Sequence, residues 1–364
     1  MQRCARASDT VARLGGDEFA ILLEDLDDVS EAVAFASRLA GGLRDPFPIQ
    51  GTELFTSASI GIATGNSAGD DVLRNADVAM YRAKAAGGGT YEVFEPKMRA
   101  ALLERLELES ELRRAVERDE FVLHFQPIYA LSDGAVAAVE ALVRWQHPTR
   151  GLVSPAAFIP LAEETGTIVG IGRRVLRDAC REAASWPACG GKEIAVAVNV
   201  SARQLQDPGL LEDVAEALSS SGLAASRLVL EITESVLAPG SERTMHVLRE
   251  LKRTGLRLAL DDFGTGYSSL RYLHEFPLDI IKIAKPFVDA VGGAGGGSTL
   301  ARAIVDIGRT FGLIVVAEGI EHPEQLLRIR GMDADLGQGF LLSRPVDAVA
   351  LKTILAGVED LRVA

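Results

Sequence analysis

Short apolar runs alternate with longer amphipathic segments from residue 121 onward, and this alternation is the strongest constraint on the fold. Strands are expected at FVLHFQPIY (121–129), AVAAVEALVRW (135–145), IAVAVNVS (194–201), LVLEITES (228–235), RLALDDF (257–263), DIIKIA (279–284), LIVVAEGI (313–320) and GQGFLLS (337–343). Such alternation predicts an α/β fold with a parallel sheet, and about eight strands over roughly 240 residues predict a closed (β/α)8 barrel. No helix separates the first two runs, and SDG at 132–134 is typical of a hairpin turn, so we expect one antiparallel strand.

Residues 1–97 lack the regular alternation seen from residue 121 and contain only a few short strand and helix candidates. This difference predicts a separate, smaller α+β domain. Its strand candidates are EFAILLE (18–24) and FTSASIGIA (55–63), and its helices are expected at SEAVAFASRLAGGLR (30–44) and DDVLRNADVAMYRAKAAGGG (70–89). A charged run with leucines at helical spacing follows, and we expect a connecting helix over residues 98–119. The barrel domain would then span residues 120–364.

Bulk properties exclude several functional classes. The formal charge of −13 argues against binding a nucleic acid polymer, which needs a basic surface. No apolar run reaches the ~18 residues of a membrane span, and the N-terminus lacks a signal-peptide pattern, although a longer source protein would have room for a membrane segment upstream. Cys4, Cys180 and Cys189 are too scattered for a disulfide framework or a zinc site. A cytoplasmic protein is therefore expected.

Polar side chains recur late in the otherwise apolar strands. They are Glu140, Asn199, Glu231, Asp261, Lys282, Glu318 and Gln338. The carboxyl ends of parallel barrel strands meet at one rim, where the acids would repel each other without a counter-ion. Oxygen ligands of this kind select Mg²⁺ or Mn²⁺, and two such ions sharing a carboxylate suit phosphodiester hydrolysis. Any one of these residues alone would more often be a helix cap, but capping does not readily explain seven of them on successive strands.

The sequence also resembles a known family, the EAL family of cyclic di-GMP phosphodiesterases. The matching motifs are FQPI (125–128), EALVRW (140–145), HPTRGLVSPAAFIPLAEETG (147–166), NVS (199–201), EITES (231–235), DDFGTGYSSL (261–270), VVAEGIE (315–321) and QGFLLSRP (338–345). The resemblance implies a modified TIM barrel with an antiparallel first strand. It also implies opening of one phosphodiester bond of cyclic di-GMP to give linear pGpG, with Mg²⁺ or Mn²⁺ as cofactor. A homodimer formed through the helix around residues 267–276 is a further family expectation.

The resemblance assigns roles by position. Glu140, Asn199, Glu231 and Asp261 would hold one metal ion, and Asp261 would bridge to a second ion near Asp262 and Glu318. Lys282 would hold and polarise the attacking water, Glu318 is a competing candidate for general base, and Glu140 completes the catalytic group. Leu142, Arg144, Gln126 and Gln338 would lie near the nucleotide. Glu321 would lie around the metal ligands without binding metal itself, and Glu234 would brace the DDFGTG loop.

One position departs from the family pattern. The family usually has Lys-Ile-Asp where this chain has Lys282-Ile283-Ala284, so a carboxylate near the second metal is missing. We still favour an active enzyme. The alternative is a catalytically weak EAL domain that acts as a cyclic di-GMP receptor.

RLGGDEFAILL (13–23), SIGIA (59–63) and NADVAMYRAKAAGG (75–88) resemble the GGDEF family of diguanylate cyclases. The resemblance implies that Gly15 and Gly16 lie near nucleotide phosphates and that Asp17 and Glu18 act in metal binding and catalysis. Phe19 is the last residue of the motif. Arg6 and Asp9 match the RxxD inhibitory site of the family, or form an exposed turn. The domain lacks the family's first strand, so we expect a partial GGDEF domain without cyclase activity. A bifunctional cyclase and phosphodiesterase is the alternative if residues are missing upstream.

Overall fold

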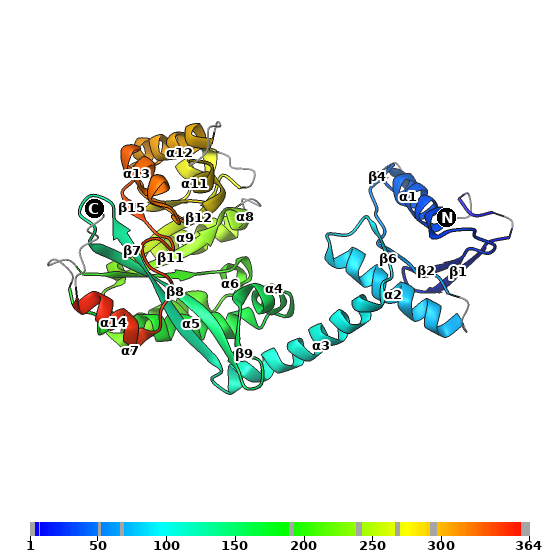
Figure 1. Cartoon of the computed structure of the whole chain (residues 1–364), viewed down its shortest axis with the longest axis horizontal. Coiled ribbons are helices and arrows are strands. Elements are labelled where there is room, and N and C mark those ends of the chain that lie inside the picture. The colour runs from blue at the N-terminus through cyan, green and yellow to red at the C-terminus, as the bar shows by residue number, and fades with distance from the viewer. Residues whose placement is uncertain are drawn as a thin grey trace. The chain divides into compact units, whose positions relative to one another are not determined.

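A computed structural model describes residues 4–6, 8–49, 52–65, 69–188, 193–237, 242–265, 270–291 and 297–357. The chain forms two compact units, Met1–Leu108 and Glu109–Ala364. Both units are drawn in Figure 1. None of the helices within the described ranges is both long and apolar enough to cross a lipid bilayer.

The larger unit is a closed barrel. Its strands are β7 (Phe121–Ala130), β8 (Val136–His147), β9 (Gly151–Val153), β10 (Ala195–Asn199), β11 (Leu228–Thr233), β12 (Arg257–Phe263), β13 (Ile280–Ile283), β14 (Ile314–Ala317) and β15 (Leu336–Gly337). Strands β10 to β15 pair in sequence order, β15 pairs with β7, β7 with β8, and β8 with β10, which closes the sheet. Strand β7 runs antiparallel to both β15 and β8, whereas β8 is parallel to β10. The predicted barrel with an antiparallel first strand is thereby confirmed.

Helices cover the outside of this barrel. They are α4 (Pro155–Thr165), α5 (Ile168–Ala184), α6 (Ala202–Gln206), α7 (Leu210–Ser221), α8 (Glu234–Leu237), α9 (Glu242–Arg253), α10 (Leu270–Glu275), α11 (Lys285–Val291), α12 (Gly297–Phe311), α13 (Pro323–Gly331) and α14 (Ala348–Ala356), with a 3₁₀ turn at Ala225–Arg227. Helix α5 illustrates the pattern, since Ile168, Ile171, Val175 and Leu176 are buried along one face. The barrel interior is filled by small and branched side chains, among them Ala138, Ala197, Val229, Ala259 and Val316.

The β7–β8 hairpin extends beyond the rim of the barrel. Strand β8 is in register with β10 only from Ala138 to Ala141, whereas its pairing with β7 continues as far as Trp145 opposite Phe121. We call residues 121–126 and 140–147, which comprise this extension and the pairs next to it at the rim, the rim wall. One face of it is covered by aromatic rings, because Phe121 and Trp145 both pack on Phe158 of α4. Strand β9, which the sequence analysis did not predict, pairs with the end of β8.

The last predicted strand is wrong over most of its length. Only Leu336 and Gly337 are strand, whereas residues 339–342 form a turn and residues 338 and 343 have no regular structure. A Cβ at Gly339 would lie 2.1 Å from the Ile320 carbonyl oxygen, so the backbone here packs directly on the loop after β14. The Ile320 carbonyl accepts a hydrogen bond from the Leu341 amide instead of a strand partner.

The smaller unit combines short strand pairs with helices. Its elements are β1 (Thr10–Gly15), β2 (Glu18–Leu22), α1 (Val29–Gly42), β3 (Phe47–Ile49), β4 (Thr52–Leu54), β5 (Ile60–Ile62), α2 (Gly69–Ala85), β6 (Tyr91–Val93) and α3 (Pro96–Glu117). Both predicted helices are present, but the strand expected over residues 55–63 is confined to Ile60–Ile62, and β1, β3, β4 and β6 were not predicted. A small core joins Ala32, Ala36 and Ile62.

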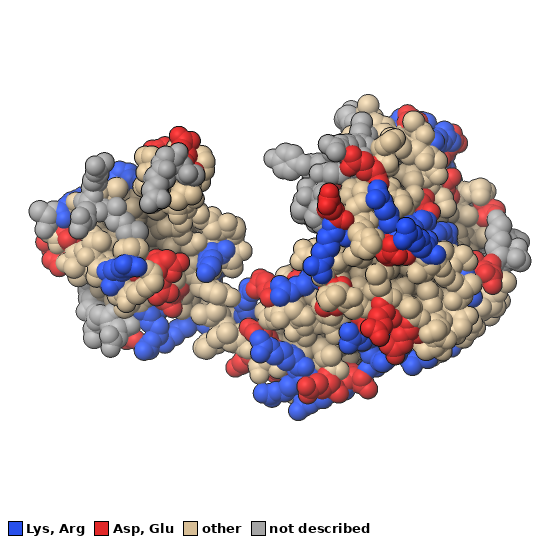
Figure 2. Space-filling model, turned by 180° about the vertical axis from the view of Figure 1, so that it is seen from behind, with Lys and Arg blue, Asp and Glu red and all other residues tan. Residues whose placement is uncertain are grey.

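Charged residues of both signs are intermixed on the face of the molecule drawn in Figure 2. Such a face lacks the single-sign basic field that a nucleic acid backbone requires.

Candidate active site

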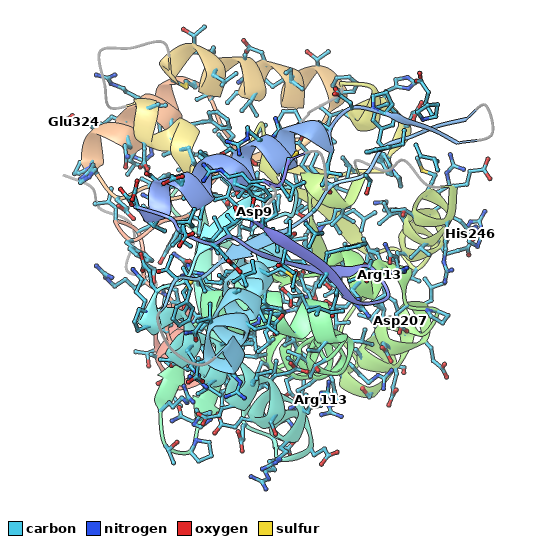
Figure 3. All side chains as sticks on the ribbon, turned by 90° about the vertical axis from the view of Figure 1, so that its right-hand side faces the viewer. Asp9, Arg13, Arg113, Asp207, His246 and Glu324 are labelled. Carbon is cyan, nitrogen blue, oxygen red and sulfur yellow. The ribbon has the colours of Figure 1, made fainter. Side chains whose placement is uncertain are left out.

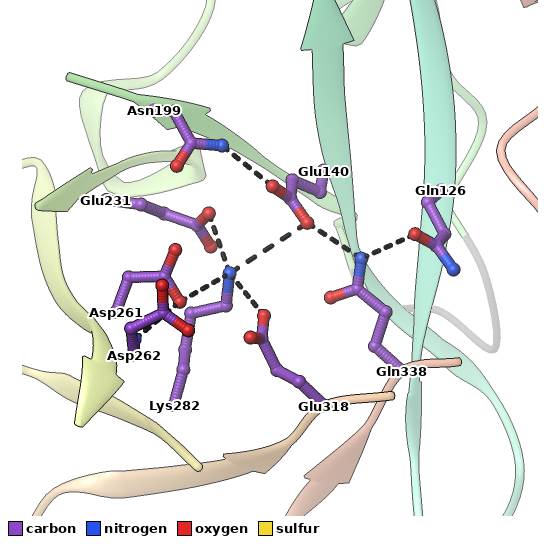
Figure 4. Close-up of polar contacts among 9 residues, drawn as sticks. All are labelled: Gln126, Glu140, Asn199, Glu231, Asp261, Asp262, Lys282, Glu318 and Gln338. Atoms are coloured by element: carbon purple, nitrogen blue, oxygen red, sulfur yellow. Dashed lines mark hydrogen bonds and ion pairs between the residues drawn. The ribbon is translucent and has the colours of Figure 1, made fainter. Parts of the chain in front are cut away.

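The polar strand-end residues converge at one rim of the barrel, as the alternation predicted. Parallel pairing places Asn199 beside Glu231, and Thr233 beside Asp261. Because neighbouring strands are only about 4.8 Å apart, these register positions bring the side chains into one cluster. Figure 4 shows the resulting group of nine residues: Gln126, Glu140, Asn199, Glu231, Asp261, Asp262, Lys282, Glu318 and Gln338.

Lys282 lies at the centre of this cluster, with its side chain 1% exposed. Its Nζ is 2.6 Å from Glu318 Oε1 and 2.8 Å from Glu231 Oε2. It is also 3.4 Å from Asp261 Oδ1 and 3.8 Å from Glu140 Oε2. One ammonium group therefore faces four carboxylates, and the cluster keeps an excess of negative charge.

Burial and mutual repulsion perturb the acids strongly. Burial raises the pKa of Glu231 well above its usual value, although the nearby Lys282 opposes the shift. Burial likewise raises the pKa of Glu318 to about 8, with Lys282 again opposing. For Lys282 burial acts to lower the pKa, but the four surrounding carboxylates outweigh it and the pKa is raised well above its usual value. Acids that resist ionisation in this way are typical of a site that binds additional cations.

Glu140 is held by amides on both of its oxygens. Asn199 Nδ2 donates to Oε1 at 2.7 Å, and Gln338 Nε2 donates to Oε2 at 2.7 Å. The same Gln338 nitrogen donates to Gln126 Oε1 at 3.1 Å, and Gln126 Nε2 donates to the Ser343 carbonyl at 3.0 Å. These contacts fix the carboxylate plane and tie the turn after β15 to the first strand. The sequence named Gln126 and Gln338, but no signal in it identified this link through Ser343.

Asp261 and Asp262 lie side by side because the backbone departs from regular strand geometry. Adjacent strand residues normally point to opposite faces. Here Asp262 has a φ of +53°, and the pairing of β12 with β13 is irregular between Leu260 and Phe263. Carboxylate oxygens of Asp261, Asp262 and Glu318 consequently lie within 4.8 Å of one another. The strand spans Arg257–Phe263, as the sequence predicted, and the irregularity lies within it.

Other predicted residues lie around this centre. Glu234 Oε2 accepts a hydrogen bond from the Gly264 amide at 3.1 Å, which braces the DDFGTG loop. Glu321 is directed elsewhere, to Lys285 Nζ at 3.1 Å. Leu142 and Arg144 lie on the rim wall, and burial lowers the pKa of Arg144.

The donor set fits divalent metal ions. It consists of carboxylate and amide oxygens, and the acids outnumber the single lysine. In addition, Gln338 Oε1 is buried and has no hydrogen-bond partner among the described residues. Asp261, Asp262 and Glu318 are close enough together to bind one ion. Ala284, at the position where the family usually has aspartate, is fully buried and offers no ligand.

A second set of predicted residues lies in the smaller unit. Gly15, Gly16, Asp17, Glu18 and Phe19 form the tip of the β1–β2 hairpin, where Gly16 has a φ of +53°. Arg6 and Asp9 line a small surface cavity together with Glu31, Phe35 and Arg38. The Arg6 amide donates to Asp9 Oδ2 at 2.6 Å, and the Arg6 guanidinium pairs with Glu31 at 2.9 Å.

Proteins of known family resemble this chain over most of its length. The EAL domain family model matches residues 109–345, and the model described as "Diguanylate cyclase, GGDEF domain" matches residues 1–90. The chain is 41% identical, over 96% of its length, to the bifunctional diguanylate cyclase/cyclic di-GMP phosphodiesterase MucR of Pseudomonas aeruginosa, and covers 52% of that protein. It is 40% identical, over 96% of its length, to the cyclic di-GMP phosphodiesterase PdeR of Escherichia coli, and covers 53% of it. The chain thus spans about half the length of these curated relatives.

A solved structure of the MucR phosphodiesterase of P. aeruginosa in complex with c-di-GMP resembles the barrel unit. The two are 40% identical, with a TM-score of 0.64, over 67% of this chain and 99% of that one.

Proposed function

The chain belongs to the EAL domain family, and we propose that it hydrolyses one phosphodiester bond of cyclic di-GMP to give linear pGpG. The observation that carries the proposal is the convergence of four carboxylates on Lys282 at one rim of the barrel. The names of the relatives MucR and PdeR, both cyclic di-GMP phosphodiesterases, support it. A phosphate diester held here would meet oxygen ligands, a buried cation and the amide-fixed Glu140.

We assign the metal ligands by position. Glu140, Asn199, Glu231 and Asp261 would hold one ion, and Asp261, Asp262 and Glu318 would hold a second, with Mg²⁺ or Mn²⁺ favoured by the hard oxygen donors. When bound, such ions lower the pKa of a water molecule and neutralise charge on the phosphate.

The side chains of the protein orient the reaction around these ions. The two amides that hold Glu140 keep its carboxylate in one plane, which fixes one wall of the site. Lys282 would hold the attacking water through its remaining hydrogen-bond capacity and offset the repulsion of the acids. Glu318 lies 2.6 Å from the same ammonium and is the competing candidate for accepting the proton. Leu142, Arg144, Gln126 and Gln338 would contact the nucleotide.

Hydrolysis is tested by incubating the purified chain with cyclic di-GMP and Mg²⁺ or Mn²⁺ and separating the nucleotides by chromatography. We expect pGpG to accumulate for the native chain and for Glu212→Gln, a control on the exposed side of α7. Glu140→Gln should lower turnover by about 100-fold or more, because each catalytic group contributes on this order. A chain that neither binds nor cleaves cyclic di-GMP would overturn the proposal.

Binding without cleavage would instead favour the second candidate, a cyclic di-GMP receptor. The specific observation behind it is Ala284, which removes a carboxylate close to the second set of ligands. In that case equilibrium binding would persist while no pGpG formed at any metal concentration.

Three further assignments accompany the main proposal. Residues 1–97 would form a GGDEF unit without cyclase activity, residues 98–119 the connecting helix, and residues 120–364 the phosphodiesterase. Incubation with GTP alone tests the expected lack of cyclase activity. A homodimer would form around residues 267–276, of which 267–269 lie outside the described residues and the rest begin at α10. Cys4 and Cys180 are free thiols, in keeping with a cytoplasmic location.

A further inference from the structure

The rim wall presents a row of side chains toward the site. On β7 and β8, Gln126 is opposite Glu140, His124 is opposite Leu142, and Val122 is opposite Arg144. Directly opposed residues share one face of an antiparallel pair, and residues two apart on a strand share that face too. Since Gln126 and Glu140 belong to the cluster, His124 must point to the same side as they do.

The other face of the wall is fixed in place by aromatic packing. Phe121 and Trp145 contact Phe158, and Phe125 contacts Trp186 edge-on with ring centroids 5.8 Å apart. All of these rings are buried, so the wall cannot twist to turn His124 away without exposing them. The backbone of the wall therefore presents the imidazole on the side of the site before any ligand arrives.

The position of His124 is remote from the reacting centre but reachable by a large ligand. Two residues along a strand span about 6.8 Å, so His124 lies roughly that far beyond Gln126. It also lies past the end of the pairing between β8 and β10, because its partner Leu142 follows Ala141, the last residue of β8 in register with β10. A ligand whose phosphate occupies the cluster would need a further group, such as a base, to reach the ring.

The surroundings of His124 favour a neutral hydrogen-bonding partner. The ring is half-buried and makes no hydrogen bond with any described residue. Burial lowers the pKa of His124, Arg144 lowers it further, and Asp347 opposes the shift. A neutral imidazole offers one donor and one acceptor, which suits the edge of a base, whereas Arg144 supplies the charge that a phosphate prefers.

We propose that His124 is a specificity-determining residue, which hydrogen-bonds a guanine base of the cyclic dinucleotide on the rim wall, away from the bond that is cleaved. This inference rests on the proposed function and adds a contact that the motifs of the sequence did not assign.

The test compares His124→Ala and His124→Gln with His246→Ala. His246 is a matched control because it lies on α9 with its side chain 71% exposed (Figure 3). For His124→Ala we expect KM for cyclic di-GMP to rise about fivefold, the usual effect of losing one neutral hydrogen bond, with kcat within about twofold. His124→Gln should recover part of the loss, and the preference for cyclic di-GMP over cyclic di-AMP should fall by a similar factor in His124→Ala.

Binding by calorimetry separates this inference from the proposed function. If the native chain binds cyclic di-GMP but does not cleave it, the chain is a receptor, and the dissociation constant for cyclic di-GMP takes the place of KM. Unchanged KM, unchanged binding and unchanged base preference in a folded His124→Ala would overturn the role of His124 while leaving hydrolysis intact. A fall in kcat with KM unchanged would also overturn it, because it would place the ring at the reacting centre. Failure of the native chain to bind or cleave would overturn both.

Discussion

Replacing Lys282 by methionine tests whether its ammonium group balances the acids of the site. Methionine keeps most of the side-chain volume but removes a charge that lies between 2.6 and 3.8 Å from four carboxylates. Removing one partner of a buried ion pair typically costs about 3–5 kcal/mol, because the remaining charges stay buried without compensation. We therefore expect the barrel of the metal-free variant to lose about 3–5 kcal/mol of unfolding free energy at pH 8.

The assay is urea unfolding in the presence of a chelator, followed by tryptophan fluorescence. The sequence contains two tryptophans, Trp145 and Trp186, and both are buried in the larger unit. The signal therefore reports on the barrel and not on the smaller unit. Adding Mg²⁺ or Mn²⁺ should reduce the loss, because a bound cation replaces the missing positive charge.

Lys285→Met is the matched control. Lys285 also pairs with two acids, Asp289 at 3.2 Å and Glu321 at 3.1 Å, but its side chain is 45% exposed. Ion pairs of this kind contribute about 0–1 kcal/mol, so this variant should lose little. If Lys282→Met cost no more than Lys285→Met in metal-free protein, the argument that Lys282 neutralises the cluster would be refuted.

Three further changes have defined outcomes. Ala284→Asp restores a carboxyl group two positions after Lys282 and should raise Mn²⁺ affinity and turnover, as measured by calorimetry and nucleotide chromatography; no change in either would mean that alanine is tolerated. The pKa of Glu318 is raised from its usual 4.5 to about 8, so its stabilising contribution is fully present below pH 4.5 and is lost as the pH rises toward 8. The unfolding free energy of the metal-free barrel should accordingly decline between pH 4.5 and about pH 8, and it should decline less steeply in Glu318→Gln. Equal slopes in the two proteins would contradict Glu318 as the cause. Asp262→Asn tolerates the left-handed backbone and should leave the unfolding midpoint unchanged while lowering metal affinity about tenfold; unaltered affinity would exclude Asp262 as a ligand.

Much of the barrel follows from patterns that are local in sequence. The interior strands are short apolar runs, and a polar residue lies at or near the carboxyl end of most of them, as Glu231 and Lys282 illustrate. The hairpin turn after β7 makes the first barrel strand antiparallel to its neighbour β8, so this part of the topology also follows from the sequence. The rim cluster was predictable because parallel strands align their carboxyl ends.

The remaining features depend on packing that no local pattern encodes. The apolar segment after Gly337 looks like a strand, but the close approach of Gly339 to Ile320 makes it a turn. The contacts of Gln338 with Glu140 and Gln126 join segments far apart in the chain, so neither partner could be inferred from its own surroundings. His124 was overlooked because a histidine inside an apolar strand carries no signal until its face of the sheet is known.

The left-handed backbone at Asp262 means that this position must satisfy two separate requirements, one on the charge of the side chain and one on the backbone angle φ. Its carboxylate is under selection as a candidate ligand, and its φ of +53° restricts which side chains the chain can accept there at all. Asparagine and glycine satisfy the backbone without the charge, whereas glutamate keeps the charge but fits the left-handed region less readily. A saturation mutagenesis library at this codon, scored separately for folded yield and for turnover, should therefore divide into two groups that overlap at aspartate.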